Sequence, residues 1–229
     1  MERNVFVFML IIGFVFSAFG QNAGDFEYTE NNGRITITGY NGSEKNVAIP
    51  NTINGMPVVV IGERAFFNKQ LIGITLPAGI TTIEDRAFRQ NQLTSVIFPD
   101  SITTIGPSAF RNNKLTSVTL PNGLTVIKAE AFRNNELTSI IIPNGVTTIE
   151  GTAFLDNQLT SVTLPNTLLY IRFSAFGNNQ LTSITLPNGL NTIAENAFRN
   201  NKITSVVVPN SVRRLHENAF DPSVEITRR

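Results

Sequence analysis

The sequence of 229 residues contains no cysteine and only one histidine. Without cysteine there is no disulfide framework, and no lipid can be attached to a cysteine at a signal-peptide cleavage site. Catalysis usually needs a proton carrier with a positioned partner, and a metal site needs several converging ligands. We therefore expect no catalytic, metal-binding or cofactor-binding residues, and we expect that the protein is not an enzyme.

Charged residues are also scarce, at 15% of the chain, and the 18 basic and 17 acidic side chains leave a formal net charge of +1. Such a balance gives no overall field to attract nucleic acid or an anionic membrane, so neither is an expected partner. The hydrophobic content of 41% is enough for a chain of this length to bury a core as one domain.

Long hydrophobic runs are missing as well. The most apolar stretch, residues 5–16, has twelve residues and is shorter than the ~20 that span a bilayer. It follows Arg3 and precedes the small-residue pattern Ser17-Ala18-Phe19-Gly20, which is typical of a secretory signal peptide cut after Gly20. We therefore expect an exported protein that is periplasmic, on the cell surface or secreted, with no membrane span in the mature chain.

Repetition is what the sequence has in abundance. The seven residues "LTSVTLP" stand at 115–121 and again at 159–165, and an Ala-Phe pair returns every 22 residues without insertion. The phenylalanines of these pairs are Phe66, Phe88, Phe110, Phe132, Phe154, Phe176, Phe198 and Phe220. A fixed period of this length predicts a solenoid in which each unit forms one coil, with the phenylalanines stacked through the core.

Each column of the repeat predicts a place in the coil. Val118 and Leu120 alternate with hydroxyl residues, as in a strand whose aliphatic side chains point inward. Pro121 ends this strand because it lacks an amide hydrogen, and the Asn-Gly pair that follows favours a tight turn. Leu124 and Ile127 then return along the opposite wall. One coil is thus a strand, a turn, a return segment and an Ala-Phe turn.

A polar column precedes each strand, two residues before its first leucine or isoleucine. Its members are Asn91, Asn113, Asn135, Asn157, Asn179 and Asn201. We expect these side chains to bond backbone groups that a turn leaves unpaired, in their own coil and in the next. The alternative, a solvent-facing loop residue, stays open at this point.

The pattern L-x-x-[IV]-x-[LI]-P, then I, then A-F, then N-x-L resembles the BspA-like (Treponema-type) leucine-rich repeats of bacterial surface proteins. The resemblance covers residues 34–220, including a lead-in at 35–66. The commonest family unit is about 23 residues long and has cysteine after A-F, where this chain has asparagine. The resemblance implies a leucine-rich-repeat-like curved coil with a parallel β-sheet on the concave face. It also implies short strands, turns or 3-10 segments on the convex side and a β-rich N-terminal cap.

The ends of a solenoid need separate segments, because its terminal strands expose unpaired edges. We expect one strand at Ile35 and Ile37 and another at Val47 and Ile49 in the N-terminal cap, and a last short strand in "SVEITRR". The expected organisation is a signal peptide at 1–20, an N-terminal cap with a degenerate first repeat at 21–70, seven 22-residue repeats at 71–220 and a C-terminal cap at 221–229.

The outward side of the strands is the candidate binding surface. One row is Ser95, Ser117, Ser139, Ser161, Ser183 and Ser205; the next is Thr75, Ile97, Thr119, Ile141, Thr163, Thr185 and Val207. Among them we select Ser95, Ser117, Thr119, Ser139, Ser161, Thr163, Ser183 and Thr185 as the binding residues. An uncharged, hydroxyl-lined surface suits a protein or glycan held by hydrogen bonds and shape. These residue types also simply favour strands, so a filler role stays open.

The resemblance implies adhesion to host extracellular-matrix proteins, host cells or other bacteria, and the alternative is a structural or scaffold component of the bacterial envelope. Other sites are the cap at 25–50, with an "NGR" tripeptide like a short cell-adhesion motif, and the basic last coil. That coil carries Lys202, Arg213, Arg214, Arg228 and Arg229. His216 falls in a variable column, and Glu195 and Glu217 share a column with no cleft around them. The oligomeric state stays open.

Overall fold

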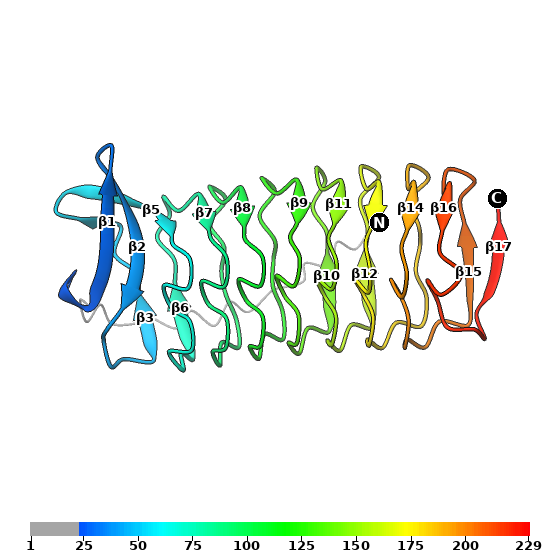
Figure 1. Cartoon of the computed structure of the whole chain (residues 1–229), viewed down its shortest axis with the longest axis horizontal. Coiled ribbons are helices and arrows are strands. Elements are labelled where there is room, and N and C mark those ends of the chain that lie inside the picture. Colours follow the sequence, from blue (N-terminus) through cyan, green and yellow to red (C-terminus); the bar gives the residue numbers. More distant parts are fainter. Residues whose placement is uncertain (1–22) are drawn as a thin grey trace, which may run out of the picture.

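The computed structural model describes residues 23–229, and the expected signal peptide lies outside this range. The chain is a β-solenoid: successive coils stack side by side along one long axis, from a cap at β1 to the last strand, β17 (Figure 1). The only helical segment within 23–229 is the 3-10 turn η1, Ala23–Asp25. The solenoid expected from the 22-residue period is confirmed.

The N-terminal cap is built from two hairpins. β1 (Phe26–Asn31) pairs antiparallel with β2 (Arg34–Tyr40), and β4 (Thr52–Ile53) pairs antiparallel with β5 (Met56–Ile61). Each is closed by an Asn-Gly pair with positive φ at both residues, which matches the twist of the strands. The strand at Ile35 and Ile37 was expected, and so was β3 (Asn46–Ala48), whereas β1 was not.

One wall of the solenoid, the return wall, consists of two-residue strands that repeat once per coil. They are β7 (Thr82–Ile83), β8 (Thr104–Ile105), β9 (Val126–Ile127), β11 (Thr148–Ile149), β13 (Tyr170–Ile171), β14 (Thr192–Ile193) and β16 (Arg214–Leu215). β7 and β8 extend the sheet of β1, β2 and β5, and the others form a parallel five-stranded sheet. The isoleucines point inward, as expected of Ile127.

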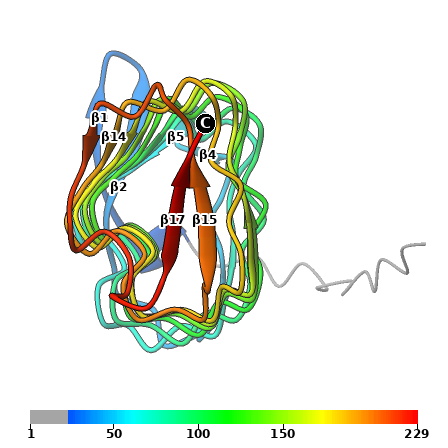
Figure 2. The ribbon, with the colours of Figure 1, turned by 90° about the vertical axis from the view of Figure 1, so that its right-hand side faces the viewer.

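The opposite wall, the hydroxyl wall, carries the predicted "TSVTL" strands. Its strands are β3, β6 (Gly73–Thr75), β10 (Ser139–Ile141), β12 (Ser161–Thr163), β15 (Ser205–Val208) and β17 (Glu225–Arg228). They pair in parallel only as β3-β6, β10-β12 and β15-β17, with one isolated bridge between Ile97 and Thr119. Viewed along the axis, β15 and β17 face β14 of the return wall across the core (Figure 2). β17 confirms the expected last strand.

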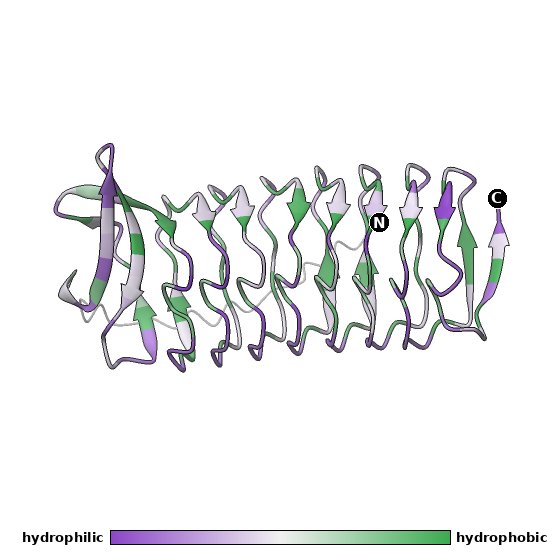
Figure 3. Ribbon diagram, viewed as in Figure 1, coloured by the Kyte–Doolittle hydropathy of each residue, from purple (hydrophilic) through white to green (hydrophobic). Residues whose placement is uncertain are grey.

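The core is a column of phenylalanine rings. From Phe66 to Phe220, consecutive rings are stacked with centroids 5.0–5.8 Å apart and interplanar angles of 3–16°. A fully buried or nearly buried alanine precedes each ring and leaves room for it. Apolar and polar residues alternate around each coil, and β15 is almost wholly apolar (Figure 3). The predicted stack is confirmed.

The asparagine column forms a buried ladder. In the central coil, Asn135 Nδ2 donates to the carbonyls of Phe110 (3.0 Å) and Phe132 (3.1 Å), and its Oδ1 accepts from the Leu115 amide at 3.1 Å. The other five members, from Asn91 to Asn201, make the same three kinds of bond. The interpretation as solvent-facing loop residues is therefore wrong, and the ladder is confirmed.

From the coil of Arg64 to the coil of Asn196, two positions in each coil adopt the left-handed conformation. The first column holds Arg64, Arg86, Ser108, Glu130, Thr152, Ser174 and Asn196; the second holds Asn68, Gln90, Asn112, Asn134, Asp156, Asn178 and Asn200. The second column is rich in asparagine, the residue besides glycine that enters this region most readily. The first column has few asparagines, so its residues do not themselves favour this conformation. Backbone bonds between coils in the Ala-Phe turn hold them in it, such as the bond from Phe132 N to Ala153 O at 3.0 Å.

Candidate binding surface

The exposed side of the hydroxyl wall, which we call the hydroxyl face, has the predicted rows of side chains. All the serines and threonines selected from the sequence are exposed, while Val118, Val162 and Ile184 lie half-buried beneath them. Pairing of Ser139 with Ser161 and of Ile141 with Thr163 shows that each row runs in register from coil to coil. The structure therefore brings these residues together on one surface.

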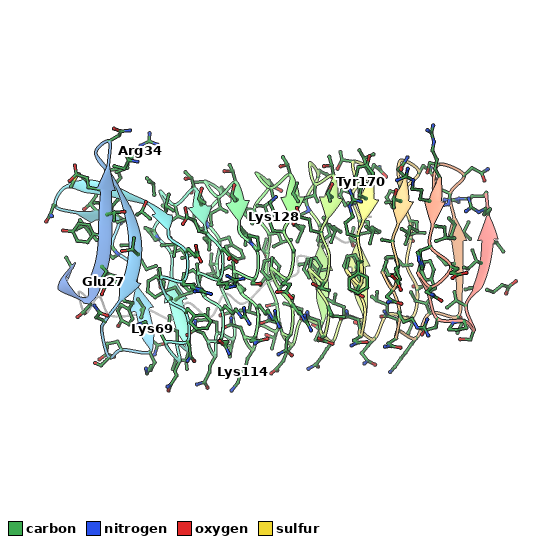
Figure 4. The ribbon with its side chains drawn as sticks, in the orientation of Figure 1. Glu27, Arg34, Lys69, Lys114, Lys128 and Tyr170 are labelled. Carbon is green, nitrogen blue, oxygen red and sulfur yellow. The ribbon has the colours of Figure 1, made fainter. Side chains whose placement is uncertain are left out.

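A third row borders the two predicted ones. Its members, Thr94, Thr116, Thr138, Thr160, Thr182 and Thr204, are all exposed, and sequence reasoning did not include them. The signal was present, because threonine precedes serine in each of the six units. Charged side chains stay at the margin of the wall, where Lys114 contacts Gln92 at 3.4 Å, and Lys69 and Lys114 lie at the lower edge of the solenoid in Figure 4. The face between 73 and 208 carries no charge in these three rows.

Two large aliphatic side chains project from the hydroxyl face. Ile97 is 87% exposed and Ile141 is 70% exposed, and one coil, with Thr119 at the equivalent position, separates them. Val207 in the same row is 46% exposed. A folded monomer gains little from isoleucine in such positions beyond its preference for strands, so the row offers apolar contact area to a partner.

A shallow recess of about 470 Å³ lies at the C-terminal end of the same face. It is lined by Ile184, Thr185, Leu186, Ser205, Val206, Val207, Glu225, Thr227 and Arg229. Residues 183–186 adopt no strand here, so the ladder is interrupted beside β15. Glu225 and Arg229 bring both signs of charge to one end of an otherwise uncharged surface.

The alternative sites have simple structural roles. Asn32 and Gly33 of the "NGR" tripeptide form the two-residue turn between β1 and β2, with φ values of 51° and 70°. His216 is exposed, and its Nδ1 accepts from the Asn218 amide at 3.2 Å. Glu195 and Glu217 are exposed as well. No group of three or more metal-ligating side chains occurs among residues 23–229.

In the basic last coil, Arg213 and Arg214 are exposed, and Arg228 donates to the Val212 carbonyl at 3.2 Å. That bond ties the terminal strand β17 to the coil before it. Part of the basic charge at this end therefore fastens the last strand, which is a capping role.

The Ala-Phe turns carry an ionic cluster that the sequence did not reveal. Glu130 accepts from Ser108 Oγ (2.8 Å), from Arg111 (2.6 Å) and from Arg133 (3.0 Å). Arg133 also lies 3.5 Å from Asp156 in the next coil. Burial raises the pKa of Glu130, but the three hydrogen bonds outweigh burial and hold this pKa below its ordinary value of 4.5. The cluster joins three successive coils.

Coils of one fixed length, with an inward aliphatic strand, an Ala-Phe turn and an asparagine ladder, define a leucine-rich-repeat protein. The family model described as "BspA type Leucine rich repeat region" matches six copies, over residues 40–158 and 148–228. The chain therefore belongs to the BspA-type leucine-rich repeat family, as the sequence pattern indicated. No curated protein matches the sequence at a significant level.

Solved structures share the fold. A leucine-rich repeat protein from Bacteroides ovatus is 23% identical with a TM-score of 0.69, and the match covers 89% of this chain and 66% of that one. The leucine-rich repeat protein of T. pallidum is 25% identical with a TM-score of 0.57, covering 76% and 84%. A leucine-rich cell surface protein from Faecalibacterium prausnitzii is 23% identical with a TM-score of 0.50, covering 90% and 76%. This chain thus spans about two thirds of the B. ovatus protein.

The part of the chain that the structure describes was also searched for membrane spans. Within residues 23–229, no helix has the length and apolar character needed to cross a bilayer.

Proposed function

We propose that this protein is an exported, non-enzymatic binding protein that attaches to a protein or glycan partner through the hydroxyl face. The partners we propose are host extracellular-matrix proteins, host cells or other bacteria. Membership in a family of bacterial leucine-rich repeats supports a protein-binding role. The fold shared with a leucine-rich cell surface protein is consistent with exposure at the surface. Export itself rests on the signal-peptide pattern of residues 1–20.

The observation that carries the proposal is the pair Ile97 and Ile141, 87% and 70% exposed within an uncharged field of serine and threonine. A partner that covers this face strips water from hydroxyls and aliphatic groups, and it avoids the large cost of desolvating unpaired charge. Aliphatic side chains supply apolar area, and the hydroxyls both donate and accept hydrogen bonds. Since coils advance ~4.8 Å each, one partner can engage several at once.

The test replaces Thr119 and Thr163, which lie two coils apart on the face, by aspartate. Both side chains are exposed, so the monomer should fold, while a carboxylate at the interface would be buried without a partner. The matched control is Thr81→Asp with Thr125→Asp, also exposed and two coils apart but next to the return wall. Binding to immobilised matrix proteins and to intact host and bacterial cells is then measured with all three proteins.

We expect the Thr119/Thr163 variant to lose attachment and the Thr81/Thr125 variant to retain it. Loss in the control alone would move the binding surface to the return wall. Retention in both, with both proteins shown to be folded, would overturn the assignment to the hydroxyl face.

The second candidate is a scaffold component of the bacterial envelope. It is favoured by the strand-forming character of the rows, because serine, threonine and β-branched residues repeated in every coil suit a purely structural wall. A pull-down with residues 21–229 against envelope extract and against matrix proteins separates the two functions. Recovery of envelope partners alone, unaffected by the aspartate substitutions, would favour the scaffold.

A further inference from the structure

Arginine side chains gather on the Ala-Phe turns of the N-terminal half. Arg86 and Arg89 belong to one turn, in which the Arg89 amide donates to the Arg86 carbonyl at 3.1 Å. Arg111 occupies the position of Arg89 in the next coil, and the Gln90 amide donates to its carbonyl at 3.0 Å. Arg64 is the equivalent of Arg86 in the preceding coil. Four guanidinium groups therefore lie on adjacent turns, away from the hydroxyl face.

The carboxylates near these arginines already form ion pairs, although Asp85 Oδ1 is buried without a hydrogen-bond partner among the described residues. Asp85 pairs with Arg86 at 2.9 Å, and Glu63 lies 3.8 Å from Arg64. Glu130 is shared between Arg111 at 2.6 Å and Arg133 at 3.0 Å. Within residues 23–229, Arg89 has neither an ion pair nor a side-chain hydrogen bond. The charge of Glu130 acts on Arg89 without forming an ion pair with it.

Buried hydrogen-bond donors also lack acceptors at this position. The Nε atoms of Arg86, Arg89 and Arg111 are buried and have no partner within the described chain. A buried donor that forms no hydrogen bond costs free energy. Burial, then the charges of Arg111 and Arg86, lower the pKa of Arg89, and the charge of Glu130 opposes this shift only in part. All three residues are only partly buried, so parts of each side chain other than its buried Nε are open to a ligand from solvent.

We propose that Arg86, Arg89 and Arg111 form a binding site for a tetrahedral oxyanion, the sulfate or phosphate ester group of a ligand. Such an ester group has three free oxygens that accept hydrogen bonds, and the three arginines belong to the turns of two successive coils. Guanidinium groups bind oxyanions through short, charge-assisted hydrogen bonds. The anion compensates the positive charge that these neighbouring side chains bring together. The site lies apart from the hydroxyl face and does not depend on the function proposed for that face.

The probes are a sulfated heparin disaccharide, its desulfated counterpart and glucose 6-phosphate, titrated calorimetrically at about 150 mM salt. The variant Arg89→Gln removes the charge and keeps a side chain of similar shape. Its matched control is Arg199→Gln, in the same column five coils away, where the arginine lies 3.9 Å from Asp221. We expect the sulfated sugar or the phosphate ester to bind, the desulfated sugar not to bind, and Arg89→Gln to weaken binding about tenfold or more.

Arg199→Gln should bind like the wild-type protein. Preference for the sulfated sugar identifies a sulfate site, and preference for glucose 6-phosphate identifies a phosphate site. Without ligand, Arg89→Gln should unfold at the same or a higher denaturant concentration, since it relieves repulsion. The proposal is overturned if neither ester binds, if Arg89→Gln binds as well as wild type, or if both variants weaken binding equally, which would indicate diffuse attraction of anions.

Discussion

At the scale of the residue, one asparagine amide per coil satisfies backbone groups that no sheet reaches. The Ala-Phe turn leaves two phenylalanine carbonyls and a leucine amide without strand partners, and the ladder side chain bonds all three. An asparagine side chain has two donors and an acceptor in a fixed plane, which hydroxyl residues lack. The residue is therefore specified by hydrogen-bond geometry and not by size alone.

Substitution of this asparagine should be costly. Asn135→Ala leaves the Leu115 amide buried without a partner and removes one of the two side-chain hydrogen bonds that each of the Phe110 and Phe132 carbonyls accepts. An unpaired buried amide costs ~1–3 kcal/mol, so we expect a loss of about 1–3 kcal/mol in the free energy of unfolding, measured by urea denaturation. Asn122→Ala, at an exposed turn, is the control and should change it by less than ~0.5 kcal/mol. Equal losses would mean that the ladder bonds do not stabilise the coil.

One threonine lies in the left-handed region, and we expect its replacement to stabilise the protein. Thr152 has φ of 57°, a conformation that costs a non-glycine residue ~1–2 kcal/mol and suits a β-branched one least. The equivalent residue two coils later is Asn196. Thr152→Asn should raise the free energy of unfolding by about 1 kcal/mol. The same exchange at exposed Thr125, on ordinary backbone, should give no gain, and a gain at both sites would point to the unfolded chain instead of relieved strain.

At the scale of the element, the Ala-Phe turns are coupled by charge as well as by backbone bonds. Glu130 accepts hydrogen bonds from Ser108 and Arg111 of the preceding turn and from Arg133 of its own turn, so one carboxylate connects two turns. The chain varies at these positions, since equivalents of Glu130 include Arg86 and Thr152. Each junction between turns thus has its own electrostatics within an otherwise uniform stack.

The lowered pKa of Glu130 makes this junction sensitive to acid. A carboxyl whose pKa is lower in the folded state stabilises the fold above its ordinary value of 4.5, and this contribution is lost as the pH falls through the lower, folded-state value. Glu130→Gln should cost about 1–2 kcal/mol at pH 7 and progressively less below pH ~4.5. Denaturation at several pH values measures this. The control is Glu136→Gln at an exposed position, and the same pH profile for both variants would contradict the prediction.

The positions of residues that repeat in every unit could be predicted from the sequence, and the contacts of residues that vary between units could not. Val118, Leu120 and Phe132 could be placed because a column of identical residues in every unit implies one environment. The partners of Glu130 could not be found this way, because they depend on which side chain occupies the same column in the next coil. The left-handed positions were missed for a related reason: Arg86 carries no mark of the backbone that it adopts. The rows of the candidate face were visible, and the third threonine row was overlooked.

At the scale of the whole molecule, one period is a removable unit. Deleting residues 115–136 joins Lys114 to Leu137 and restores the same sequence of columns, so the shortened chain should fold to the same far-UV spectrum. Its denaturant m-value should fall in proportion to the lost surface. Deleting 115–125, half a period, puts polar residues at core positions and should abolish cooperative unfolding. If both deletions fold alike, the register between coils is not what holds the stack.

The backbone bonds between coils, such as Phe88 N to Ala109 O at 2.9 Å, point along the long axis. Tension applied to the two ends therefore loads the coil interfaces in series, while the bonds inside one interface share the load. An end coil, which has a neighbour on one side only, yields first and its neighbour next. Each coil occupies ~4.8 Å of the axis and releases up to roughly 75 Å of extended chain. Under shear we expect the molecule to lengthen in equal steps, one coil at a time from its ends. The work of unfolding each end coil is absorbed before the inner coils unfold.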